Sequence, residues 1–127
     1  MNGTFVAGRP CIELSVPGSS APLILQIDTF GDYPIALPAH IASQLNYRAM
    51  LAYANHRLLD GRVITMRRGE IDIVVPNRPT PLAVKIRIFQ HFNVVGHPGR
   101  IDGYVGEEFL KNHLLTIDYP GVTVTVA

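Results

Sequence analysis

An acidic residue directly follows one of the most apolar stretches of the sequence. Leu23–Ile27 reads Leu-Ile-Leu-Gln-Ile, and Asp28 and Thr29 come next. The short continuous apolar run is typical of a strand that is buried on both faces. An ionised carboxylate at the end of such a strand is costly unless it is paired or hydrogen-bonded. Asp28 is therefore either a catalytic carboxylate or a strand-end acid that caps its own turn with help from Thr29.

Other residue patterns that could do chemistry are weaker. The chain has five histidines: His40, His56, His91, His97 and His113. No two of them have the four-residue spacing of a helical zinc site. The only cysteine is Cys11, which excludes an intrachain disulfide and a thiolate metal site. Nucleophile-elbow serines and glycine-rich phosphate loops are also absent, so we expect neither the enzymes that use them nor a metal site.

The elements that must position Asp28 are mostly strands. Alternating or continuous apolar runs predict strands over Cys11–Val16, Leu23–Ile27, Ile35–Leu37, Arg62–Val75, residues 82–89, Leu115–Asp118 and Val122–Val126. Asp60-Gly61 has apolar residues on both sides and predicts a hairpin turn. Short helices are expected over Ala39–Leu45, after Pro38, and over Glu107–His113. Asp32 and Asp102 are expected to be turn acids. This order favours a closed or sandwiched all-β domain.

Length and charge narrow the classes of function. The 127 residues, 47% hydrophobic and 17% charged, predict a single globular domain over residues 1–127. A net charge of +1 lacks the basic excess of a nucleic-acid-binding protein. The densest basic stretch, Arg57, Arg62, Arg67 and Arg68, is expected to be a solvated strand face. With no apolar run long enough to span a bilayer and no signal peptide, we expect no membrane partner and a cytoplasmic protein.

The ordered set of segments resembles the retropepsin-like aspartic peptidases, the single-domain half-pepsin enzymes. The first half carries the resemblance in Pro10–Val16, Leu25–Thr29, Ile35–Pro38 and the helix with Ala42 and Leu45. The second half carries it in Asp60-Gly61, Tyr104–Leu110, Leu115–Asp118 and the valine strand. The resemblance therefore covers nearly the whole chain, and it implies a small closed β-barrel with one or two short helices.

The resemblance implies an aspartic endopeptidase that works as a homodimer on a peptide or protein substrate and needs no metal or organic cofactor. Asp28 would be the catalytic carboxylate, with Thr29, Phe30 and Gly31 supporting it. Asp60 and Gly61 would lie in a flap over the substrate, and Val105 and Gly106 would form the second half-site motif. Two aspartates that meet at the two-fold axis cannot both be ionised, so they would share one proton.

One residue departs from the family pattern. The third position of the Asp-Thr-Gly motif is Phe30, and glycine follows at position 31. Glycine allows close backbone approach, whereas phenylalanine adds a bulky ring. Two readings follow: a loop that is shifted by one residue in an active peptidase, or a catalytically inactive domain that binds peptides or dimerises. A third reading, independent of Phe30, is an unrelated small β-barrel that binds a ligand or a partner.

Overall fold

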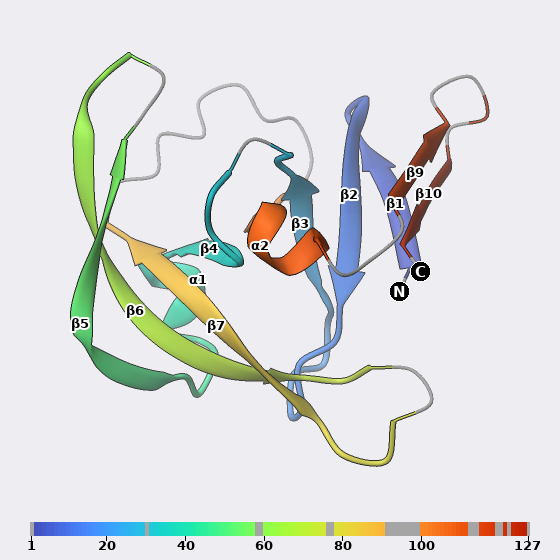
Figure 1. Cartoon of the computed structure of the whole chain (residues 1–127). Coiled ribbons are helices and arrows are strands. Elements are labelled where there is room, and N and C mark those ends of the chain that lie inside the picture. Colours follow the sequence, from blue (N-terminus) through green and yellow to red (C-terminus); the bar gives the residue numbers. More distant parts are fainter. Residues whose placement is uncertain are drawn as a thin grey trace.

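The structure is a computed structural model, and it describes residues 2–29, 31–57, 60–75, 78–90, 100–111, 115–118, 121 and 123–126. These residues are mostly β, with two four-residue helices (Figure 1). The strands are β1 (Asn2–Val6), β2 (Arg9–Leu14), β3 (Leu23–Ile27), β4 (Ile35–Pro38), β5 (Arg48–Arg57), β6 (Val63–Ile73), β7 (Leu82–Phe89), β8 (Gly103–Val105), β9 (Leu115–Asp118) and β10 (Thr123–Val126). The helices are α1 (Ala39–Ala42) and α2 (Glu107–Leu110).

The described strands form one mixed sheet in the order β5-β6-β7-β4-β8-β3-β2-β1-β10-β9. The sheet curls so strongly that the ends of β2 and β6 meet at a single antiparallel bridge, where the Val74 amide donates to the Ser15 carbonyl at 2.8 Å. Within the described residues, β5 and β9 end the sheet and do not pair with each other. The all-β expectation is confirmed at this level, while the closed barrel is not.

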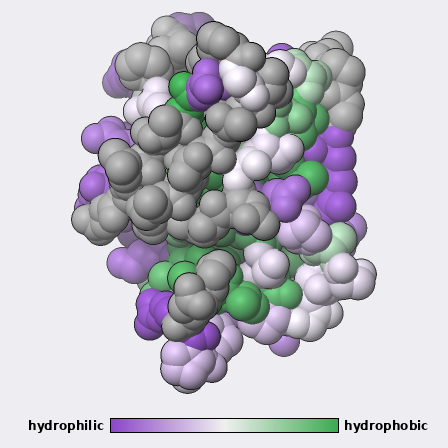
Figure 2. All heavy atoms as spheres, turned by 90° about the vertical axis from the view of Figure 1, so that its right-hand side faces the viewer, coloured by the Kyte–Doolittle hydropathy of each residue, from purple (hydrophilic) through white to green (hydrophobic). Residues whose placement is uncertain are grey.

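The terminal strands lie together at one side of the molecule. β1 pairs with both β2 and β10, and the two chain ends are neighbours in Figure 1. Figure 2, turned to show this side, has hydrophobic residues at the surface among hydrophilic ones. The sequence analysis did not predict β1. It joins β2 through a two-residue turn in which both Ala7 (φ 51°) and Gly8 (φ 76°) have positive φ, as a tight hairpin requires.

The core lies inside the curl of the sheet. Its fully buried side chains come from six strands: Ile12, Leu14, Leu25, Ile35, Leu37, Ile71, Ile73, Ile86 and Val105. On β3 the alternate residues Ile24 and Gln26 are only half-buried. The prediction that this strand is buried on both faces is therefore confirmed only in part. Each fully buried aliphatic side chain contributes roughly 1.5–3 kcal/mol. This packing fixes the register of β3, and with it the position of Asp28.

A second, smaller cluster covers the opposite face of the same strands. Tyr33, Ala36, Met66 and Phe89 are buried there, with Ile64 and Tyr104 packed against them. We call this side of the sheet the Asp28 face, because Tyr33 connects it to Asp28.

β8 lies between two strands that are consecutive in the sequence. It pairs parallel with β3 and antiparallel with β4, so residues 103–105 separate residues 23–27 from residues 35–38. A Cβ at Gly103 would lie 2.8 Å from a side-chain carbon of Leu37, so glycine allows this close packing. The insertion brings residues 103–107 against the Asp28 loop.

Some expected boundaries differ from the observed ones. Both helices are shorter than expected: α1 ends at Ala42, and turn hydrogen bonds continue to Leu45. The described part of the second helix is α2, and His113 lies outside the described residues. β5 was not predicted, because its exposed residues do not alternate clearly and a bulge between Met50 and Tyr53 interrupts its register.

Candidate functional site

Asp28 lies at the carboxyl end of β3, where the strand leaves the sheet. Its backbone amide donates to the Val105 carbonyl on β8 at 2.9 Å, and its own carbonyl accepts from the Gly31 amide at 3.2 Å. The carboxylate is half-buried, while the neighbouring Thr29 is exposed. Phe30 lies outside the described residues. The strand-end position that the sequence predicted for Asp28 is confirmed.

The backbone that follows β8 holds the Asp28 loop in place. The Gly106 amide donates to the Pro34 carbonyl at 2.9 Å, and the Glu107 amide donates to the Gly31 carbonyl at 2.8 Å. A Cβ at Gly106 would clash with the Tyr33 carbonyl and would lie 2.8 Å from the Gly31 carbonyl. Val105 and Gly106, which the sequence assigned to a second half-site motif, are thus brought against the Asp28 loop.

Tyr33 contacts the carboxylate directly, and the sequence analysis did not single it out. Its hydroxyl donates to Asp28 Oδ2 at 2.7 Å, and its ring is buried. Burial, together with the hydrogen bond to Asp28, raises the pKa of Tyr33 well above its usual value. The phenol therefore stays protonated and remains a donor. In the sequence, only the short spacing between Tyr33 and Asp28 could have indicated this contact.

Gly31 makes room for this contact. A Cβ there would lie 2.5 Å and 2.6 Å from two ring carbons of Tyr33 and 2.9 Å from Asp28 Oδ2. Any larger residue at position 31 would push the Tyr33 ring away from the carboxylate. Gly31 thus supports the site, although by a steric route that the sequence did not indicate.

A second set of contacts connects the Asp28 loop to the β5–β6 hairpin. His56 on β5 lies with Nδ1 3.0 Å from Asp32 Oδ1. The His56 and Tyr33 rings meet edge to face, with centroids 5.7 Å apart. Asp32, expected to be a turn acid only, therefore also bonds to the hairpin.

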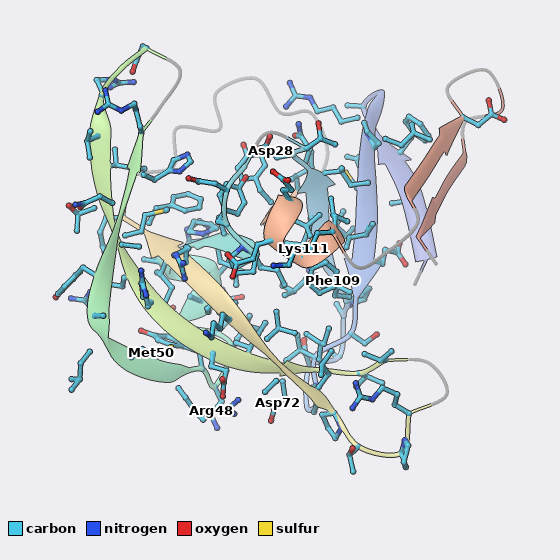
Figure 3. All side chains as sticks on the ribbon, in the orientation of Figure 1. Asp28, Arg48, Met50, Asp72, Phe109 and Lys111 are labelled. Atoms are coloured by element: carbon cyan, nitrogen blue, oxygen red, sulfur yellow. The ribbon has the colours of Figure 1, made fainter. Side chains whose placement is uncertain are left out.

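The predicted flap residues lie at the tip of this hairpin. Asp60 is exposed and accepts hydrogen bonds from the Arg62 amide at 3.0 Å and the Arg62 Nε at 2.6 Å. These bonds hold the pKa of Asp60 below its usual value. Gly61 has φ 89°, which glycine adopts readily. The hairpin turn is confirmed, and in the view of Figures 1 and 3 its tip points toward the same end of the molecule as Asp28.

The basic stretch is not wholly a solvated face, as the sequence had indicated. Arg57, Arg62 and Arg67 are exposed, but Arg68 is half-buried and its Nε is fully buried. Arg67 and Arg68 are consecutive in β6, so their side chains lie on opposite faces of the sheet. The prediction is therefore wrong for Arg68.

Asp102 differs from the other acids because it is buried. Its Oδ2 accepts from the Ile24 amide at 2.8 Å, and its Oδ1 accepts from Arg100 Nε at 3.1 Å. Asp102 therefore ties the start of β8 to β3. It stabilises the insertion of β8 and takes no part in the Asp28 site.

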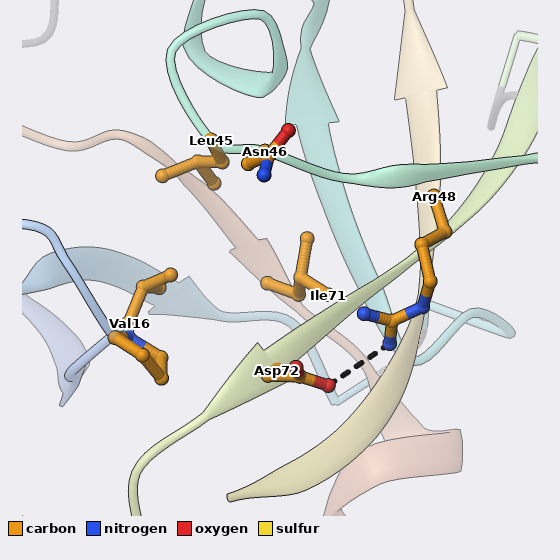
Figure 4. A pocket seen from close by; sticks show the side chains of 7 residues that line it. Val16, Leu45, Asn46, Arg48, Ile71 and Asp72 are labelled. Atoms are coloured by element: carbon orange, nitrogen blue, oxygen red, sulfur yellow. Dashed lines mark hydrogen bonds and ion pairs between the residues drawn. The ribbon is translucent and has the colours of Figure 1, made fainter.

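A shallow pocket of about 170 Å³ lies elsewhere on the molecule. Its walls include Val16, Leu45, Asn46 and Ile71 (Figure 4). The charged groups at its rim, Arg48 and Asp72, are bonded to each other at 2.9 Å, and Figure 3 shows both far from Asp28. The pocket brings no reactive group together.

Other chemistries find little support in the described part of the chain. It contains no group of three His, Cys, Asp or Glu side chains placed to hold a metal ion. His91, His97 and His113 lie outside it. None of its helices has the length and apolar character needed to cross a membrane.

Comparison with known proteins gives no assignment. No protein-family model matches the chain, and no curated protein matches it significantly. The functional argument therefore rests on the residues and their geometry.

Proposed function

We propose that this protein is a retropepsin-like aspartic endopeptidase that works as a homodimer, with one Asp28 from each protomer. The observation that carries the proposal is the support of the Asp28 loop by β8. Hydrogen bonds from and to Val105, Gly106 and Glu107 fix the turn that presents Asp28. These are the segments in which the sequence resembles the two half-site motifs of the family.

The chemistry follows from two carboxylates that share one proton. One Asp28 takes a proton from water as the oxygen attacks the scissile carbonyl, and its partner donates a proton to the carbonyl oxygen. The C–N bond then breaks, and the amine leaves with a proton. The products are a carboxylic acid and an amine, and the step needs no metal. One carboxyl must stay protonated, so activity is greatest at acid to mildly acid pH.

The surroundings of Asp28 fit this role. Thr29 is exposed beside Asp28, which leaves its hydroxyl able to bond across a dimer interface. Contacts of His56 with Asp32 and Tyr33 hold the β5–β6 hairpin near the site at a point just before its turn, so that its tip can cover an extended peptide. The strong curl of the sheet, with the bridge between Ser15 and Val74, supports the closed barrel that the family fold requires.

A second candidate is a catalytically inactive domain of the same fold that binds peptides or dimerises. The observation in its favour is the Tyr33 hydroxyl, which already donates to Asp28 Oδ2 at 2.7 Å. A carboxylate oxygen that is held by its own chain has less capacity to bind the catalytic water.

The experiment is cleavage of a mixed peptide library between pH 3 and pH 7 by the wild type and by Asp28→Asn. Asp72→Asn is the matched control, because it removes an acid that lies far from Asp28 and that the proposal does not use. Cleavage that is lost only in Asp28→Asn supports the peptidase. Equal cleavage by Asp28→Asn refutes it, and no cleavage by a folded, dimeric wild type favours the inactive domain.

A further inference from the structure

Two arginines lie directly opposite each other on neighbouring strands. Arg68 of β6 and Arg87 of β7 are register partners, and both are half-buried. Like charges in this position repel each other and destabilise a sheet. The Arg68 Nε is buried and has no hydrogen-bond partner among the described residues. A buried donor without a partner costs free energy. An anion bound at the two arginines would offset this cost and the repulsion between their charges.

The acids around this pair are committed to other contacts or remain at a distance. Glu70 and Asp72, the next residues on the same face of β6, both bond to Arg48. Asp32 bonds to His56. The negative charges of Glu108 and Asp32 favour the charged form of Arg87 but form no ion pair with it among the described residues, and burial and the charge of Arg68 lower the pKa of Arg87.

The arginine pair shares a face with the proposed catalytic site. Successive register partners form one row that crosses five neighbouring strands: Arg68, Arg87, Ala36, Tyr104 and Gln26. Members of such a row lie on the same side, and Ala36 and Tyr104 belong to the cluster that contains Tyr33. The row is therefore part of the Asp28 face.

The separation fits a peptide that runs along this face. The four strands from β7 to β3 are about 4.8 Å apart, which puts the Cα atoms of Arg87 and Asp28 roughly 15 Å apart. An extended peptide advances about 3.4 Å per residue, so roughly four residues span this distance.

We propose that Arg68 and Arg87 form a subsite for a carboxylate side chain of the substrate. The proposal rests on the proposed function, and it makes the enzyme selective for peptides with Asp or Glu about four residues from the scissile bond. Two guanidinium groups present planar sets of donors that match the two oxygens of a carboxylate. The bound carboxylate would accept hydrogen bonds from the two guanidinium groups and would neutralise the repulsion between the two arginines.

The first test does not depend on activity. The protein is titrated with two blocked peptides, acetyl-Ala-Glu-Ala-Ala-amide and acetyl-Ala-Gln-Ala-Ala-amide, while NMR follows the arginine Nε–H signals. We expect the Glu peptide to shift the Arg68 and Arg87 signals and to bind at least about tenfold more tightly than the Gln peptide. Equal shifts with the two peptides would overturn the proposal.

Variants locate the binding. Arg68→Gln and Arg87→Gln each remove one of the paired cations, and Arg67→Gln removes the same charge from the opposite face of β6. Selectivity for the Glu peptide should fall about tenfold in the first two and stay unchanged in the third. An equal fall in Arg67→Gln would show a general charge effect and would refute the subsite.

A cleavage assay separates this proposal from the proposed function. In the peptide library, the wild type should prefer an acidic residue at one position, and Arg87→Gln should cleave without that preference. Cleavage by the wild type with no acidic preference refutes the subsite alone. If the wild type cleaves no peptide but still binds the Glu peptide selectively, the peptidase is refuted and the subsite stands.

Discussion

Substitution of Gly106 by alanine tests whether β8 holds the Asp28 loop. Gly106 has φ −105°, which alanine adopts without strain, so the cost of the substitution is steric. The new Cβ would clash with the Tyr33 carbonyl and would lie 2.8 Å from the Gly31 carbonyl. Both are backbone atoms, so the loop itself must move. Such a movement stretches the two bonds that the Gly106 and Glu107 amides make to this loop.

The expected loss follows from these contacts. Two backbone hydrogen bonds are worth about 1 kcal/mol each, and the overpacking adds about 1–3 kcal/mol. Gly106→Ala should therefore lower the free energy of unfolding by about 3–5 kcal/mol, or the urea midpoint by about 2 M. Peptide cleavage should fall in parallel while the variant is still folded.

Gly18→Ala is the matched control. A Cβ at Gly18 meets nothing within 4 Å, but φ is +80°, so the cost is conformational alone. An alanine held at this positive φ should lower the free energy of unfolding by about 1–2 kcal/mol. If Gly106→Ala is no less stable than Gly18→Ala by urea denaturation, β8 does not hold the loop as described.

Three further predictions concern single side chains. The raised pKa of Tyr33 means that the folded state keeps this proton to higher pH than the unfolded chain, whose tyrosines titrate near about 10. The stability that Tyr33 contributes is therefore fully present below this pH and is lost as the pH rises further. In urea denaturation series from pH 9 to 11.5, the free energy of unfolding of the wild type should fall more steeply than that of Tyr33→Phe. Equal slopes would contradict this. Burial raises the pKa of the Cys11 thiol and shields it, so thiol reagents at pH 8 should modify it about a hundredfold faster in urea than in the folded protein; comparable rates would show that the site is open. Asp102→Asn should cost about 1–3 kcal/mol by urea denaturation, because it weakens the bonds of a buried carboxylate, and the exposed Arg100→Gln should cost less; the reverse order would be inconsistent with the buried role of Asp102.

The local pattern of apolar residues predicted those strands in which apolar side chains gather on a buried face. β7 was predicted because its apolar residues alternate, and β3 because its short apolar run is typical of a buried strand; the acid after β3 lies where this run ends. The contact between Asp28 and Val105 was accessible only through the resemblance, because nothing in the local sequence brings these two residues together.

The missed features depend on tertiary packing. β5 is an edge strand with mostly exposed residues, so burial imposes no alternation on it. The role of Tyr33 depends on the space above Gly31, and the partial burial of Arg68 depends on its pairing with β7. Each arises from distances between segments, which a single sequence does not contain.

The insertion of β8 between β3 and β4 also has a consequence for biosynthesis. While the chain emerges from the ribosome, residues 23–38 are present long before residues 103–107, and the sheet has a gap where β8 belongs. Non-local pairings of this kind form late and slowly. The carboxylate of Asp28 is therefore fixed in position only after residues 103–107 have been synthesised, and a nascent chain without them lacks the hydrogen bonds that hold the Asp28 loop.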